Sequence, residues 1–282
     1  MGRWSTGAGF LLLLLLCPLP LAAAGIIGTV VEGNELRAGI SLPGGLGADL
    51  TITFEQVEGL TAESVGLDAS LVSLTPGLLE RLGGALLPSA FPVLIRIEPP
   101  AGGGLSFQGV VDIGIHTHNL PFTADTPLRF FASSNGGPFQ DITVSMGMGS
   151  YRARGRKGSF SEFLILADLR RVNRVIAEKL DRVDGLLAEH EAQIAPAVFS
   201  DLAALAAQIR SKHSAGDTAG AIAKTEQFVA LVDSHSGADI PDVWRSARDL
   251  VNVAGLLRAA GDTLRFSLIL KSNQGTGLLG LL

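Results

Sequence analysis

The spacing of apolar residues changes once along the chain, near Asp168. Before it, apolar and polar residues alternate in short runs, as in 51–54 and 95–98. This alternation is typical of strands with one buried and one solvent-facing side. Turn residues between the runs, such as those at 43–45 and 135–138, indicate repeated chain reversal. We predict strands at 26–31, 36–42, 50–54, 71–74, 93–97, 110–115, 128–132, 142–144 and 163–166, with a further extended piece over 149–154.

After Asp168 the period becomes about 3.6 residues, which predicts amphipathic helices. The first should begin near Asp168 and stop before Pro196, with Lys179 on its solvent-facing side. The second covers 199–209, and the third is capped by its first residue and covers 217–236. The fourth is opened by proline 241, buries Trp244 and extends to about 270. One short helix, over 76–82, interrupts the strand region.

These elements predict an α+β protein in two modules. Residues 25–168 should form an antiparallel, immunoglobulin-like β-sandwich, because about nine short strands follow one another without long helices. Residues 169–270 should form a helical bundle, since short helices need to pack on one another or on the sandwich to be stable. Residues 271–282 should form a flexible tail.

The first 24 residues have the pattern of a secretory signal peptide. Arg3 precedes an apolar run at 10–16, prolines follow, and three alanines precede the expected cut after Ala24. We therefore expect a secreted, periplasmic or cell-envelope protein with no transmembrane segment once the leader is removed. Two alternatives remain open: the leader stays as an uncleaved anchor, or Cys17 is lipidated.

Composition and charge exclude several protein classes. The chain is 47% hydrophobic and 17% charged, which is too apolar for a disordered protein. Its one cysteine lies in the leader, so a disulfide framework is not expected. Residues 25–168 carry 8 basic and 14 acidic side chains, and residues 169–282 carry 13 of each. The resulting net charge of −6 argues against binding to nucleic acid.

The clearest charge cluster is Arg152, Arg154 and Arg156, with Lys157 beside them. The three arginines share one face of the expected extended segment, and forked guanidinium donors suit carboxylates, phosphates or the acidic surface of a partner protein. These four residues are our candidate binding site. The alternative is a solvated edge strand whose charges oppose aggregation between sheets.

We expect no catalytic residues and no cofactor. The chain has no Gly-x-Ser-x-Gly elbow between a strand and a helix, and no phosphate-binding loop. His116 and His118 share one face of a strand, with Asp112 and Asp125 nearby, which leaves open a metal-binding or enzymatic protein centred on the two histidines. A metal site would need further ligands that the sequence does not identify.

Through the runs 93–99, 128–131, 139–143 and 160–165, residues 93–168 resemble a bacterial relative of the β-sandwich found beside ankyrin repeats and in netrin receptors. In self-cleaving members of that group, a His-Phe-Ser tripeptide cuts the chain before the serine. Here Phe160 and Ser161 match, but Ser159 replaces the histidine base, so the resemblance implies a scaffold. Self-processing near Ser161 stays as an alternative. Residues 215–237 resemble the helical hairpins called FIMAH domains, which end many secreted bacterial proteins.

Together these observations predict an exported, non-enzymatic protein of an uncharacterised bacterial family. Its expected role is structural, in adhesion, or in binding another protein.

Overall fold

The computed structural model describes residues 25–123 and 125–276, so the expected leader lies outside the described residues. The chain forms a mixed α+β structure in which every strand pairing within the two sheets is antiparallel. This confirms the predicted fold class at the level of α+β with antiparallel sheets; the immunoglobulin-like form stays a prediction.

The larger sheet has seven strands in the order β1-β2-β3-β6-β10-β9, with β12 also paired to β6. Its strands are β1 (Gly25–Glu32), β2 (Glu35–Leu42), β3 (Leu46–Glu58), β6 (Ser106–Pro121), β9 (Thr143–Gly147), β10 (Ser150–Lys157) and β12 (Val243–Arg245). β10 lies between β6 and β9. The interpretation of the arginine segment as a protected sheet edge is therefore wrong.

The smaller sheet has five strands in the order β4-β5-β11-β7-β8. They are β4 (Leu67–Leu71), β5 (Val93–Ile97), β7 (Leu128–Ser133), β8 (Gln140–Asp141) and β11 (Glu162–Ala167). β4 lies before the predicted range 71–74, because Gly66 ends a short helix, α1 (Ala62–Val65), and Leu67 pairs at once with Ile97. The helix α2 (Pro76–Arg81) forms where predicted, and Thr75 Oγ1 accepts a hydrogen bond from Leu78 N at 3.2 Å.

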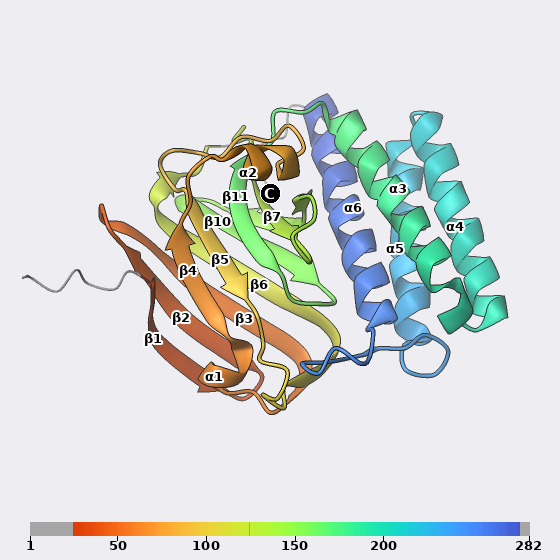
Figure 1. Ribbon diagram of the computed structural model, residues 1–282. Helices are drawn as coiled ribbons and strands as arrows, with labels where there is room; N and C mark the ends of the chain where they lie inside the picture. The colour runs from red at the N-terminus through yellow and green to blue at the C-terminus, as the bar shows by residue number, and fades with distance from the viewer. Residues whose placement is uncertain (1–24, 124, 277–282) are drawn as a thin grey trace, which may run out of the picture.

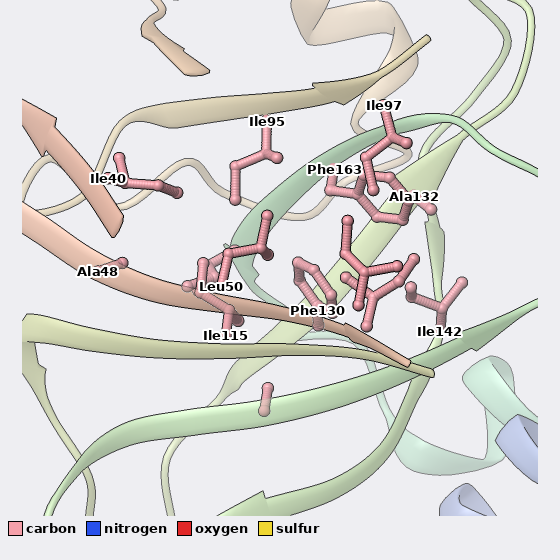
Figure 2. Packing of buried hydrophobic residues seen from close by; sticks show 14 of the residues in the cluster. Ile40, Ala48, Leu50, Ile95, Ile97, Ile115, Phe130, Ala132, Ile142 and Phe163 are labelled. Carbon is pink, nitrogen blue, oxygen red and sulfur yellow. The ribbon is translucent and has the colours of Figure 1, made fainter. Parts of the chain in front are cut away.

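The two sheets share one hydrophobic core. Figure 2 shows side chains of the larger sheet, such as Leu50 and Ile115, pointing toward those of the smaller sheet, such as Ile95 and Phe130. All four are at most 2% exposed. Phe130 also stacks on Phe163, with ring centroids 5.6 Å apart. Each such side chain contributes about 1.5–3 kcal/mol on burial, so the alternating pattern is what holds the sheets together.

The C-terminal part contains four long helices and one short 3₁₀ turn. They are α3 (Val172–His190), η1 (Glu191–Gln193), α4 (Pro196–Ser214), α5 (Thr218–Ser234) and α6 (Val253–Thr276). Their apolar stripes form a second core that includes Ile176, Leu202, Phe228 and Leu264. Asp217 caps α5 as predicted, because its Oδ1 accepts from Gly220 N at 2.8 Å. No helix among residues 25–123 and 125–276 is long and apolar enough to cross a membrane.

The predicted fourth helix is wrong in its first half. Trp244 lies in β12, where it pairs with Phe107 and stacks on its ring at 5.3 Å. The long helix α6 starts only at Val253, just after Asn252, whose side chain accepts from Gly255 N. An indole on an apolar run fits a helix stripe and a sheet equally well, and here the neighbouring aromatic rings favour the sheet. α6 also continues to Thr276, beyond the start predicted for the flexible tail.

The helices are joined closely to the sandwich. Figure 1 shows them standing beside the sheets, with α6 nearest, and α6 contacts β6, β9 and β10. Phe266 and Leu270 of α6 belong to the sandwich core. Arg258 of α6 also pairs with Glu55 of β3 at 2.7 Å. The predicted division into two modules stays a prediction, and residues of both parts meet at this junction.

Gly158 sets how closely α6 approaches the end of β10. A methyl group added at Gly158 would lie 2.4 Å from backbone atoms of Gly255 and Leu256, so neither side can yield cheaply. We expect Gly158→Ala to lower the free energy of unfolding by about 1–3 kcal/mol, measured from urea unfolding. The matched control is Gly77→Ala on α2, where an added methyl meets open space. Equal midpoints for the two variants would contradict the close contact.

Candidate functional site

β10 carries the four predicted binding residues and directs them to two faces. Arg152, Arg154 and Arg156 lie on its outer side, whereas Lys157 is buried, because successive side chains of a strand alternate. Arg152 and Arg154 are exposed and form no ion pair with any described residue. Their role in binding an acidic partner surface stays a prediction.

Arg156 is already neutralised by two carboxylates. It donates to Asp112 of β6 at 3.0 Å and to Asp262 of α6 at 2.7 Å. Burial disfavours the charged guanidinium, but the hydrogen bonds to both carboxylates outweigh this and raise the pKa of Arg156. Arg156 therefore ties the larger sheet to α6, and Asp112 is not available to the histidines.

Lys157 is the unusual cation of the group. Its residue is 5% exposed, and its Nζ donates to Ser134 Oγ at 3.2 Å. No carboxylate in the described part of the chain pairs with it. Burial, together with the positive charge of Arg182 on α3, lowers the pKa of Lys157 to about 7. Folding thus encloses an ammonium group without providing its counter-charge.

A cavity of about 310 Å³ opens beside Lys157, between β8, the end of β10, α3 and α6. The residues that line it include six cations, Arg156, Lys157, Arg170, Arg174, Lys179 and Arg182. The same walls contain two carboxylates, Asp141 and Glu178, together with apolar groups, Phe139, Ile142, Val175, Leu256, Ala259 and Ala260. The cavity therefore combines apolar side chains with cations that come from β10, from α3 and from the segment before α3.

α3 supplies three of the six cations, Arg174, Lys179 and Arg182. Lys179 lies four residues after Val175, and Arg182 lies three residues after Lys179, so these side chains share one side of the helix with Glu178. Lys179 was predicted to face solvent, but it is 7% exposed and pairs with the buried Asp141 at 2.8 Å. That pairing is what allows a lysine on the buried side of an amphipathic helix.

Carboxylates neutralise four of the six cations. Besides Arg156 and Lys179, Arg170 pairs with Asp168 at 2.7 Å, and Arg174 pairs with Glu178 at 3.0 Å. Burial raises the pKa of Asp141, but the Lys179 ammonium and hydrogen bonds from Thr143 outweigh it and hold the pKa below its usual value. Within the described residues, Lys157 and Arg182 are the two cavity cations without an ion-paired carboxylate. Together they leave a local excess of positive charge.

The two predicted histidines meet a carboxylate that sequence reasoning missed. Asp49 of β3 lies directly opposite His116 of β6, and its Oδ2 contacts His116 Nδ1 at 3.2 Å and His118 Nε2 at 3.0 Å. The hydrogen bond from His118 lowers the pKa of Asp49, although partial burial opposes it. Asp125, the other predicted neighbour, is not part of this group. The missed signal was the polar side of β3, where Asp49 alternates with buried residues.

Ser161, the residue of the self-processing alternative, is 7% exposed. Its Oγ lies 3.0 Å from Ser134 Oγ, which in turn accepts from Lys157 Nζ. These hydrogen bonds involve no histidine, so no imidazole takes the place of the base that Ser159 replaces in the sequence. Self-processing stays a prediction.

Comparison with known proteins identifies a family without a known activity. No curated protein and no solved structure matches the chain. The resemblances to the ankyrin- and netrin-receptor sandwich and to FIMAH hairpins therefore stay predictions. A model of a family of unknown function, DUF6689, matches residues 10–271, which is most of the chain. The protein belongs to the DUF6689 family.

Proposed function

We propose that this protein is an exported, non-enzymatic binding module whose cavity holds the acidic group of a small organic ligand. The observation that carries the proposal is Lys157, a buried ammonium without a carboxylate partner that lines a cavity beside Arg182. Export rests on the leader pattern, and the absence of catalysis rests on the missing catalytic motifs.

The electrostatics favour an anion in the cavity. Removing a charged group from water is costly unless an opposite charge and hydrogen bonds replace the water. The chain satisfies that need for Lys179 with Asp141 but not for Lys157. A carboxylate placed between Lys157 and Arg182 would accept hydrogen bonds from both and supply the negative charge that the two cations lack. This arrangement is typical of a preformed binding site.

The apolar walls narrow the class of ligand. Phe139, Ile142 and Leu256 would contact the body of a ligand while its acidic group meets the cations. The volume of about 310 Å³ lies at the lower end for small-molecule sites. We therefore propose a monocarboxylic acid with a compact apolar body, rather than a free inorganic anion.

The test is titration calorimetry of the mature protein with benzoate and hexanoate, with benzyl alcohol and inorganic phosphate as comparisons. We expect one molecule of acid to bind per chain and neither comparison compound to bind as tightly. Lys157→Met and Arg182→Gln should each weaken binding at least tenfold, because each removes a charge from the cavity. Arg152→Ser, which removes an exposed arginine from the same strand, is the matched control and should bind normally.

The affinity should also depend on pH. Lys157 has a pKa of about 7 in the free protein, so above pH 7 binding an anion must first return a proton to it. The association constant should fall by up to about tenfold per pH unit above 7. Equal binding of acid and alcohol, or full binding by both cavity variants, would overturn the proposal.

A further inference from the structure

We infer that Asp49, His116 and His118, on the outer face of the larger sheet, form a binding site for a divalent transition metal of the zinc class. None of the three residues lines the cavity. His116 and His118 are two residues apart on β6 and so point to the same side of the sheet. The register of β3 brings Asp49 opposite His116. Asp49 lies 67 residues before His116 in the sequence, so three ligands of suitable chemistry meet only because β3 and β6 are neighbouring strands.

The distances fit the edges of a coordination polyhedron. One ligand atom from each of the three residues can be chosen so that all lie within 4.8 Å of one another. Zinc binds imidazole nitrogen and carboxylate oxygen at about 2.0–2.2 Å, so two ligands of a tetrahedral site lie roughly 3.3 Å apart. The contacts from Asp49 Oδ2 to His116 Nδ1 and to His118 Nε2 are 3.2 and 3.0 Å. Small rotations of the three side chains would admit a metal ion.

A second polar group orients the first histidine. Ser150, at the start of β10, lies 2.6 Å from His116 Nε2, which leaves Nδ1 directed at Asp49. Metal-binding histidines commonly have such a partner on the other ring nitrogen, and it sets the ring orientation and tautomer. A histidine held at both nitrogens needs only a small adjustment to accept a metal.

Exposure and donor type define the expected metal and its coordination. The side chains of Asp49 and His118 are 60% and 50% exposed, so the site is accessible from solvent. Three protein ligands leave a position for water or for a ligand from another molecule. Two nitrogen donors favour Zn²⁺, Cu²⁺, Ni²⁺ or Co²⁺ over Mg²⁺ and Ca²⁺, which prefer oxygen ligands. Arg152 lies opposite His116 on β10, and its positive charge would limit the affinity for the metal alone.

The experiment titrates Zn²⁺ and Co²⁺ into tag-free, metal-stripped mature protein, followed by calorimetry and by the visible absorption of Co²⁺. We expect one ion per chain, a Co²⁺ spectrum of low-symmetry nitrogen–oxygen coordination, and no comparable binding of Mg²⁺. His116→Ala, His118→Ala and Asp49→Asn should each weaken binding at least tenfold. Asp49→Asn keeps the size of the side chain, so it tests the site even where a histidine variant folds poorly.

The matched control is His235→Ala. His235 also contacts an aspartate, Asp239, at 2.6 Å, but this pair has no third metal-binding residue grouped with it in the described chain. His235→Ala should bind Zn²⁺ as the unmodified protein does. The inference fails if no saturable binding occurs, or if the three site variants bind as tightly as the control. Neither outcome bears on the cavity, so this proposal and the proposed function fail independently.

Discussion

Lys157→Met should make the protein more stable at pH 6, by about 2–4 kcal/mol. Its ammonium is buried without a counter-charge, and burial lowers its pKa to about 7 from an ordinary value of 10.5. Each unit of that depression corresponds to about 1.4 kcal/mol of cost to the folded state at low pH. Methionine has a similar length and no charge, so it removes the cost at the expense of one hydrogen bond to Ser134.

The stability that Lys157→Met gains over the unmodified protein should disappear as the pH rises. Between pH 7 and 10.5 the unfolded chain holds the lysine proton and the folded chain does not, so the unmodified protein becomes more stable with rising pH. The difference between the two proteins should therefore shrink by about 2–3 kcal/mol from pH 7 to pH 9. Urea unfolding of both proteins at each pH measures it, because other titrating groups cancel in the comparison.

Lys212→Met is the control for this pH dependence. Lys212 lies at the end of α4 with 47% of its side chain exposed, and it pairs with Asp217 at the surface. Its removal should change stability little and equally from pH 6 to pH 9. A Lys157→Met variant that is less stable at pH 6, or whose gain is the same at pH 9, would show that the ammonium is not enclosed. Stabilisation accompanied by loss of acid binding would be typical of a binding residue retained at a cost in stability.

Asp141→Asn should lower the free energy of unfolding by about 3–5 kcal/mol. The Asp141 carboxylate, 3% exposed, accepts from Lys179 Nζ at 2.8 Å and from Thr143 Oγ1 at 2.6 Å. Asparagine can still accept from Thr143, but it leaves the Lys179 ammonium buried without a counter-charge. Removing one member of a buried ion pair is costly for that reason. The loss should loosen α3 from β8, which the pair connects.

A double-mutant cycle separates this effect from a simple loss of packing. Asp141→Asn combined with Lys179→Met removes both charges, so the double variant should recover most of the stability lost by Asp141→Asn alone. Asp181→Asn on the same helix is the control, since that carboxylate is 70% exposed and its pair with Arg210 lies at the surface. Additive losses in the cycle would contradict a coupled pair, and so would an effect of Asp141→Asn no larger than that of Asp181→Asn.

The sequence predicted the elements better than it predicted the site. Most strands and the first three long helices lie near their predicted ranges. The reason is that apolar residues recurring every 2 or every 3.6 positions can be recognised within a short stretch of sequence. Trp244 was assigned to a helix because an apolar residue after a proline suits a helix or a strand, and only its contacts with the rings of Phe107 and Phe160 decide between them. Arg152, Arg154 and Arg156 share a face as predicted from alternation, whereas the local pattern could not show that Arg156 is neutralised by Asp262, 106 residues away.

The sequence by itself determined most of the segments that become strands or helices, with the region around Trp244 as an exception, and it identified the basic residues of β10 and the two histidines. The tertiary structure alone decided what these residues face. Register between β3 and β6 brings Asp49 to the histidines, and the docking of α3 and α6 encloses Lys157 beside Arg182. The physical reason is the sequence distance over which each effect operates. The periodicity of buried positions depends on residues close together in sequence. Whether a buried charge has a counter-charge depends on groups that are brought together only when the elements pack.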